Sequence, residues 1–284
     1  MKKPRISVVI PTLNEEFYLP KLLKDLSKQK GEIDHEVIIV DGCSEDKTRE
    51  VAQAFDKDFS LTVVESSRRN LSFQRNLGVK KAKGDYVILI DADCRLDKDF
   101  LQKVQHSIAT YRPLVTIPTI VTYLHTHANQ TTFQLSNYVI EISQKVGRPV
   151  SPGACLIFAR SFFSFIGGFE VSTKQDKKIL FPEDMELMQK VYRAGVRAYF
   201  MRDTLVYFSL RRYKKEGHLK VLTKYFIGII DSLTKGRLQT PDVPYEMGGQ
   251  YYGDPEVAPS VDQFEKYKKQ LRSLRRQFIL LFGD

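Results

Sequence analysis

Two aspartates stand one residue apart at the end of an apolar run. The segment "LIDADCRL" (89–96) places Asp91 and Asp93 directly after isoleucine and leucine. Side chains alternate along an extended strand, so residues two apart point to the same side. Two carboxylates that close repel each other unless a cation lies between them. Such oxygens suit Mg²⁺ or Mn²⁺, whose remaining ligands are often phosphate oxygens. The alternative is a pair of solvated acids at a turn.

Polar segments also follow two other apolar runs. The first run, "ISVVI" (6–10), leads into "PTLNE", and "HEVIIVDG" (35–42) leads into "DGCSED". These two runs have the apolar character of buried parallel strands. A third short strand is predicted at "LTVVES" (61–66), and a fourth in the run before Asp91. Helical segments are predicted between them, at 19–26, 44–55 and 71–84. This alternation predicts a doubly wound sheet, which binds ligands beyond the carboxyl ends of its strands. Three acid-bearing strand ends are therefore expected at one edge.

The second half of the chain has a looser pattern. A strand-forming stretch at 113–124 contains Pro118, which indicates an edge position or a bend. Further predicted elements are a helix at 131–146, a strand, short helix and Gly-Gly turn within 151–170, and a helix after Pro182. The fold class predicted is α/β, with a mixed, mostly parallel sheet flanked by helices.

The bulk composition restricts the class of protein. With 284 residues, 42% hydrophobic and 27% charged, the chain is globular. No apolar run approaches the ~20 residues of a membrane span, and the initial run is too short for a signal peptide, so a cytoplasmic location is expected. The three cysteines are scattered, which argues against disulfides and structural zinc. The net charge of +10 favours an anionic partner. A phosphorylated ligand or an anionic membrane fits better than nucleic acid, for which no aromatic–basic motif stands out.

Five segments in order resemble the family 2 glycosyltransferases, which have the GT-A nucleotide-diphospho-sugar-binding fold. They are "SVVIPTLNEE", "VIIVDGCSED", "QRNLGVKKAKGDYVILIDADC", "FIGGFE" and "FPEDMELMQKVYRAG". The resemblance runs from about residue 5 to about residue 210. It implies transfer of a sugar from a nucleotide-diphosphate sugar, with Mn²⁺ or Mg²⁺ as cofactor.

The resemblance also implies roles for residues on the donor side. The nucleotide-sugar-binding positions are Pro11, Thr12, Asn14, Glu15, Asp41, Arg75, Asp91, Ala92, Arg211 and Arg212. Asp41 would contact the base or ribose, Asp91 would hold the ribose and share the metal, and Asp93 would coordinate the metal directly. Many relatives have Asp where this chain has Gly42, and Gly where it has Cys43, so the choice between UDP and GDP stays open. Relatives often have a metal-ligating His after the last strand, for which His218 is the nearest candidate.

On the acceptor side, the resemblance implies a base in "PED". An inverting transfer needs a group that removes the proton of the attacking hydroxyl. Asp184 is the predicted general base, and Glu183 orients it or contacts the acceptor. Gly167 and Gly168 would shape the acceptor pocket. The alternative is that both acids only favour the start of a helix through its dipole.

Residues 1–212 are predicted to form the GT-A domain, with a nucleotide-binding half (about 1–100) and an acceptor half (about 101–212). Residues 213–284 form a basic C-terminal extension with a Pro/Gly-rich loop at 236–260. Segments 219–233 and 264–281 have apolar residues at helical spacing beside lysines and arginines. Such amphipathic helices either lie on the inner face of an anionic membrane or pack on the protein. The oligomeric state stays open.

The function predicted is a metal-dependent inverting glycosyltransferase that uses a UDP- or GDP-sugar and a hydroxyl acceptor on a glycan or lipid-linked glycan. Two alternatives share the fold: a polyprenyl-phosphate glycosyl synthase and a retaining glycosyltransferase. From other classes, a non-catalytic sugar-nucleotide-binding protein and a nucleic-acid-binding module are the alternatives.

Overall fold

The computed structural model describes residues 5–31, 33–122, 127–151, 153–171, 183–209 and 211. The predicted C-terminal extension, together with Pro182, Arg212 and His218, lies outside the described residues.

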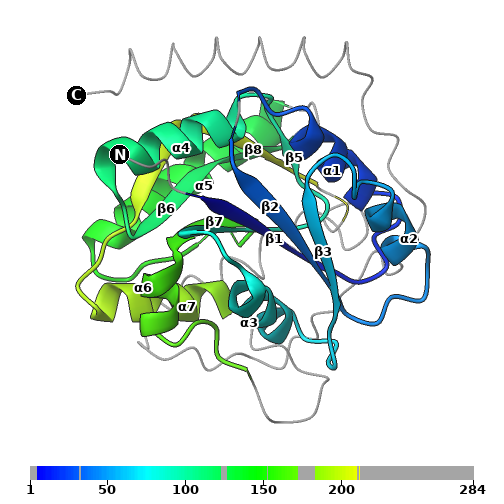
Figure 1. Cartoon of the computed structure of the whole chain (residues 1–284). Coiled ribbons are helices and arrows are strands. Elements are labelled where there is room, and N and C mark those ends of the chain that lie inside the picture. Colours follow the sequence, from blue (N-terminus) through cyan, green and yellow to red (C-terminus); the bar gives the residue numbers. More distant parts are fainter. Residues whose placement is uncertain are drawn as a thin grey trace.

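Strands and helices alternate through the first half of the chain (Figure 1). They are β1 (Ile6–Thr12), α1 (Leu19–Ser27), β2 (His35–Asp41), α2 (Thr48–Gln53), β3 (Ser60–Glu65), α3 (Leu71–Lys81) and β4 (Tyr86–Ile90). β1 pairs in parallel with both β2 and β4, and β2 pairs in parallel with β3. The predicted doubly wound arrangement is confirmed, so the carboxyl ends of these strands share one edge.

The second half inserts antiparallel strands into the same sheet. Its elements are β5 (Arg95–Leu96), α4 (Phe100–Tyr111), β6 (Val115–Thr122), α5 (His127–Lys145), β7 (Cys155–Ala159), α6 (Arg160–Phe165), α7 (Glu183–Arg193) and β8 (Tyr199–Phe208). The strand order is β3-β2-β1-β4-β7-β6-β8-β5. β7 runs antiparallel to β4 and β6, and β5 runs antiparallel to β8. The sheet is therefore mixed, as predicted.

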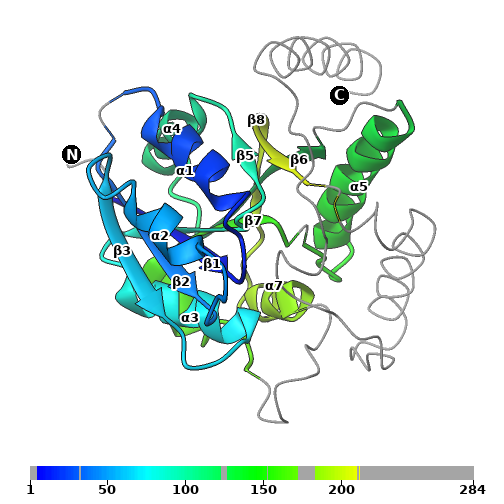
Figure 2. The ribbon, with the colours of Figure 1, turned by 90° about the vertical axis from the view of Figure 1, so that its right-hand side faces the viewer.

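Alternation along β1 separates two apolar layers. Ile6, Val8 and Ile10 pack with the buried leucines of α1 and the apolar face of α4. Val9 lies in the other cluster, with residues of α3, α6 and α7. Figure 2 shows α1 and α4 on one side of the sheet and α3 and α7 on the other. Because both faces are covered, the strands can be apolar throughout, which is why their runs are uninterrupted.

Two features of β6 and α4 differ from the prediction. Pro118 lies inside β6, between β7 and β8, and not at the edge of the sheet. The register with β8 shifts between Pro118 and Thr119, and β7 pairs only with Val115 and Thr116. The missing N–H of Pro118 thus falls at an irregularity, where the ladder tolerates it. α4 was not predicted, although Phe100, Leu101, Val104 and Ile108 are buried at helical spacing.

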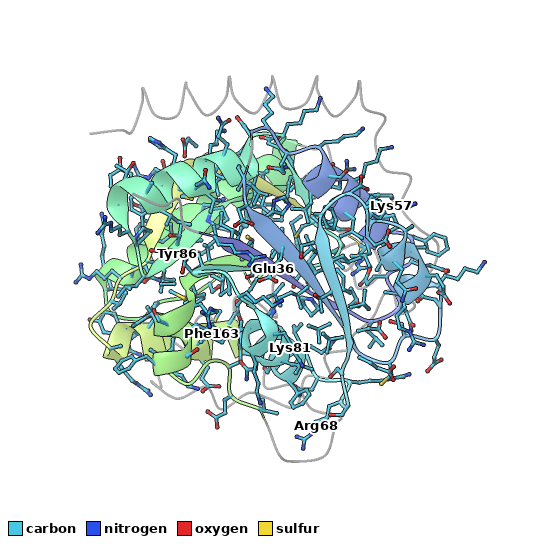
Figure 3. The ribbon with its side chains drawn as sticks, viewed as in Figure 1. Glu36, Lys57, Arg68, Lys81, Tyr86 and Phe163 are labelled. Atoms are coloured by element: carbon cyan, nitrogen blue, oxygen red, sulfur yellow. The ribbon has the colours of Figure 1, made fainter. Side chains whose placement is uncertain are left out.

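The direction of β7 brings the start of that strand to the carboxyl end of β4. The backbone N–H of Asp91 donates to the carbonyl of Ala154 over 3.1 Å. Glu36 and Tyr86, labelled in Figure 3, lie near the first residues of β2 and β4 and mark the opposite edge. The candidate site thus receives residues from both halves of the chain.

Candidate active site

Reciprocal hydrogen bonds lock the loops after β1 and β2 together. The backbone N–H of Asn14 donates to Ser44 Oγ (2.9 Å), and Glu45 N–H donates to Asn14 Oδ1 (2.7 Å). Glu15 N–H donates to Thr48 Oγ1 (2.7 Å). Asn14 has a φ of 54°, a left-handed conformation that asparagine tolerates better than most residues. These hydrogen bonds between the two loops fix the backbone position of Glu15.

Asp41 is enclosed by the same loops. Its Oδ1 accepts hydrogen bonds from Thr12 Oγ1 (3.2 Å) and Ser44 Oγ (2.5 Å), and its Oδ2 accepts from Ser44 N–H (2.9 Å). The residue is fully buried. Contact between Asp41 and a base or ribose stays a prediction.

The sequence departs from the family pattern at Gly42 and Cys43, and the structure constrains both positions: neighbouring atoms leave little room at residue 42, and residue 43 has a positive φ. A Cβ on Gly42 would lie 3.0 Å from Nε2 of Gln74 and 3.2 Å from the carbonyl oxygen of Thr12. That Nε2 donates to the carbonyls of Thr12 (2.9 Å) and Val40 (2.8 Å). Cys43 has a φ of 63°, the conformation that favours glycine. Gln74 therefore occupies the space that a larger residue at position 42 would need.

Arg211 joins the loop after β1 to the D-x-D segment. Its Nη1 and Nη2 donate to Oε2 (2.8 Å) and Oε1 (2.6 Å) of Glu15, and its Nε lies 3.0 Å from Asp93 Oδ2. Burial raises the pKa of Glu15 to about 7, Arg211 opposes this rise, and the charges of Asp93 and Asp91 add to it. The three carboxylates therefore form one electrostatic cluster around the guanidinium.

Arg75 links the donor side to the acceptor side. Its Nη2 donates to Asp91 Oδ1 (2.7 Å) and to the carbonyl of Gly153 (3.1 Å), while Nη1 donates to Glu183 Oε1 (3.0 Å). The guanidinium carbon lies 5.3 Å from the centre of the Phe169 ring. Only 2% of the Arg75 side chain is exposed. In this arrangement Arg75 supports two carboxylates, and a direct contact with nucleotide stays a prediction.

Asp184 lies in the first turn of α7 and is buried. Burial and the neighbouring Glu183 charge raise its pKa to about 7, against the lowering effects of Arg75 and of hydrogen bonds from the Asp184 and Met185 backbone. Gly153, with a φ of +71°, faces this carboxylate, because a Cβ there would lie 3.1 Å from Asp184 Oδ2. A carboxyl group with a pKa near neutrality is suited to proton transfer.

The structure thus brings most of the predicted polar residues together. A continuous series of contacts and charges joins Glu15, Arg211, Asp93, Asp91, Arg75, Glu183 and Asp184. Pro11 lies in β1, and Ala92 is buried between the two aspartates.

The backbone conformation of this fold explains why glycine occupies positions 167 and 168. Both have positive φ, and a Cβ on Gly168 would lie 2.6 Å from Asn76 Oδ1. The Asn76 side chain bonds both backbone groups of Phe169, at 2.8 and 3.0 Å. The turn therefore positions the ring that packs on Arg75. Contact with an acceptor stays a prediction.

Three residues of the site were not predicted: Tyr18, Gly153 and Phe169. Tyr18 and Phe169 present rings to the guanidiniums of Arg211 and Arg75, at 4.7 and 5.3 Å. Gly153 precedes a buried strand in "SPGACLIF", which was a usable signal. Its relevance depends on the antiparallel direction of β7, since only then does that segment meet Asp91.

A family model described as glycosyl transferase family 2 matches residues 7–166. The chain belongs to this family. A relative is the poly(ribitol-phosphate) beta-N-acetylglucosaminyltransferase TarS of Staphylococcus aureus, 23% identical over 73% of this chain and 36% of TarS. A Methanococcus voltae dolichyl N-acetyl-alpha-D-glucosaminyl phosphate 3-beta-D-2,3-diacetamido-2,3-dideoxy-beta-D-glucuronosyltransferase is 27% identical over 63% of this chain and 57% of its own. The chain spans between about a third and just over half of these relatives.

Solved structures of family members confirm the GT-A fold. TarS residues 1–349 with UDP-GlcNAc give a TM-score of 0.56 at 21% identity, covering 72% of this chain and 58% of that one. The mannosyltransferase PcManGT of Pyrobaculum calidifontis, with GDP-Man and Mn²⁺, gives 0.57 at 20% identity, covering 80% and 65%. Within the described part of this family 2 chain, no helix has the length and apolarity to cross a membrane.

The donor set of this family 2 chain fits a divalent ion that is completed by substrate. No group of three or more His, Cys, Asp or Glu among the described residues forms a metal site on its own. Asp91 pairs with Arg75 through its Oδ1, and Asp93 pairs with Arg211 through its Oδ2, so each ion pair uses one carboxylate oxygen. Mg²⁺ and Mn²⁺ are commonly held by one or two carboxylates plus phosphate oxygens and water. The residues present therefore match an ion that arrives with a diphosphate.

Replacing Arg75 by Met is expected to destabilise the fold by about 3–5 kcal/mol, because it leaves Asp91 and Glu183 charged and without their partner. Urea unfolding at pH 7 measures this loss. The loss should shrink as the pH falls, because burial raises the pKa of Asp91 to about 6 and its protonation removes one unpaired charge. Arg69→Met is the control: Arg69 is 45% exposed and pairs with Glu45, so we expect a change of under about 1 kcal/mol. Equal losses in both variants would contradict the supporting role of Arg75.

Proposed function

We propose that this family 2 chain is a metal-dependent inverting glycosyltransferase. It would move a sugar from a UDP- or GDP-sugar to a hydroxyl group of a glycan or lipid-linked glycan. The observation that carries the proposal is the connection, through Arg75, between the D-x-D carboxylate Asp91, the partly buried Glu183 and the buried Asp184. One end of this series has the chemistry of a diphosphate–metal site, and the other has the chemistry of a base. Family members bound to UDP-GlcNAc and to GDP-Man with Mn²⁺ support the donor class.

On the donor side, Asp91 and Asp93 would hold the divalent ion. When bound, the ion neutralises charge on the diphosphate leaving group as the sugar–phosphate bond breaks. Arg75 fixes the Asp91 carboxylate through a 2.7 Å contact, so that this oxygen is oriented before the donor arrives. The loop carrying Asn14 and Glu15 would form the nucleoside side of the pocket.

On the acceptor side, Asp184 would remove the proton of the attacking hydroxyl. Its pKa of about 7 leaves a large share of the carboxyl groups ionised at neutral pH, while the group stays basic enough to accept a proton. Glu183 is held by Arg75 at 3.0 Å, so it adds negative charge beside Asp184 and opposes its ionisation. The missing side chain of Gly153 leaves the Asp184 Oδ2 side uncrowded.

A polyprenyl-phosphate acceptor is the second candidate, because a phosphate is already ionised and needs no base. The burial and raised pKa of Asp184 favour the hydroxyl acceptor over it. A cytoplasmic enzyme with peripheral contact to an anionic membrane would suit a lipid-linked acceptor. Flotation with acidic liposomes at low salt measures that contact, and a chain that stays unbound would remove the membrane from this proposal.

Thermal unfolding with a panel of nucleotides tests the donor site directly. A ligand that binds only the folded chain raises its stability by about 2.7 kcal/mol at one hundred times its Kd. We expect stabilisation by UDP or by GDP in the presence of Mn²⁺, and loss of that stabilisation with EDTA. AMP and CMP serve as controls for unspecific anion binding to this basic chain. No shift with any nucleoside diphosphate would contradict the proposed function.

A further inference from the structure

Arg211 uses all three of its guanidinium nitrogens on acidic side chains of the donor site. Two of them form a fork with the carboxylate of Glu15, at 2.6 and 2.8 Å. The third, Nε, lies 3.0 Å from Asp93 Oδ2. Asp93 is the residue that the proposed function gives to the divalent ion, so the guanidinium and that ion share one carboxylate.

The surroundings of Arg211 hold it as an enclosed cation. Its side chain is 11% exposed, and those of Glu15 and Asp93 are each 7% exposed. The guanidinium carbon lies 4.7 Å from the centre of the Tyr18 ring, a favourable place for a cation. Without a positive charge here, the carboxylates of Glu15, Asp91 and Asp93 would repel one another in a site with little water.

Arg75, the other arginine of the site, does not compete in the same way. Arg75 lies in α3 and donates hydrogen bonds to Asp91 Oδ1, to Glu183 Oε1 and to the carbonyl of Gly153. Its departure would leave the partly buried carboxylates of Asp91 and Glu183 without this partner. Arg211 follows the end of β8, and the two carboxylates that its guanidinium contacts, those of Glu15 and Asp93, both belong to the donor site.

We propose that Arg211 is the resident cation of the D-x-D site in the unliganded chain, and that it makes binding of the divalent ion depend on the diphosphate. This inference rests on the proposed donor site. Asp93 exchanges Arg211 for the divalent ion, and Arg211 exchanges Asp93 for phosphate oxygens, which its planar fork matches. The site keeps a positive partner for its carboxylates at each stage. The ion alone must displace the guanidinium without compensation, and therefore binds weakly.

Titration with Mn²⁺, followed by calorimetry and by the spin resonance of free Mn²⁺, tests the exchange. For the wild-type chain we expect weak binding of Mn²⁺ alone and much tighter binding with UDP or GDP. Arg211→Gln should bind Mn²⁺ alone about tenfold more tightly, as expected from removal of one competing charged hydrogen bond. The gain in Mn²⁺ affinity on adding nucleotide should fall by at least the same factor, because the ion alone already binds more tightly and the contact of Arg211 with the phosphates is lost. The gain in nucleotide affinity on adding Mn²⁺ should fall equally, because coupling between two ligands is reciprocal.

Arg202→Gln is the control for net charge, because Arg202 is 67% exposed and pairs with Glu141 on α5; its Mn²⁺ affinity should equal that of the wild type. Arg211→Lys keeps the charge but loses the fork, and should fall between wild type and Arg211→Gln. If Arg211→Gln does not fold, the Mn²⁺ affinity of Arg211→Lys tests the inference instead.

Unchanged or weaker binding of Mn²⁺ alone by the folded Arg211 variants would overturn the inference. Equal Mn²⁺ affinity with and without nucleotide in the wild type would do the same. Failure of the proposed function is a different result: no nucleoside diphosphate would bind to the wild type, with or without Mn²⁺.

Discussion

Replacing Asp184 by Asn is expected to lower the transfer rate by about 10²- to 10⁴-fold, the usual contribution of a positioned general base. Asn has the same shape as Asp, so it fits the same space beside Gly153. The donor contacts of Glu15, Asp91 and Asp93 do not involve Asp184, and nucleotide binding should therefore stay unchanged. Single-turnover transfer, with nucleotide affinity measured in parallel, separates the two effects.

The pH dependence gives this prediction a second readout. The base acts in its ionised form, and its pKa is about 7. The rate of the wild-type chain should therefore rise tenfold per pH unit below pH 7 and level off above it. Asp184→Asn should remove this dependence together with most of the activity.

Glu186→Gln is a matched control for Asp184→Asn. Glu186 lies in the same helical turn, and burial together with Glu170 raises its pKa to about 7 as well. It pairs with Lys190 and takes no part in the contacts of Arg75. We expect Glu186→Gln to keep both the rate and the pH profile. Full turnover by Asp184→Asn would instead exclude Asp184 as the base and favour an acceptor that is already ionised, such as a polyprenyl phosphate.

Replacing Asp93 by Asn is expected to abolish the Mn²⁺ dependence of nucleotide binding. Loss of a partner outside the coordination shell already costs about 10- to 100-fold in metal affinity, so loss of a ligand should cost more. Nucleotide-induced stabilisation should become equal in Mn²⁺ and in EDTA, and it should be small in both. Calorimetry with UDP or GDP at fixed Mn²⁺ gives the size of the loss.

Asp99→Asn makes the same change of charge outside the site, where Asp99 pairs with Lys103 in the first turn of α4. It should leave the metal requirement intact. The Asp93 and Arg211 variants are expected to change the affinity for Mn²⁺ in opposite directions, because one removes a ligand and the other removes a competitor. An unchanged metal requirement in Asp93→Asn would contradict the role of the D-x-D segment.

Patterns that depend on neighbours in the sequence predicted much of the fold. The apolar runs that became β1, β2 and β4 are buried on both faces, and this environment selects uninterrupted apolar residues. Parallel strands joined by helices must place their carboxyl ends at one edge. For that reason Glu15, Asp91 and Asp93 could be assigned to one site before the structure was known. Of the two positions expected for Pro118, an edge or a bend, the edge was wrong, because tolerance of proline depends on where the neighbouring strand stops, and that is not a local property.

The sequence by itself determined the doubly wound first half, the edge that carries the acids, and the resemblance to family 2. Only the tertiary structure decided which charges meet. Arg75 pairs with Glu183 across 108 residues, and Arg211 pairs with Glu15 across 196. These pairings depend on the antiparallel insertion of β7 and on the place of β8 in the sheet, which no periodicity records. The raised pKa values of Glu15 and Asp184 follow from the same packing, because burial and neighbouring charges exist only once distant segments have come together.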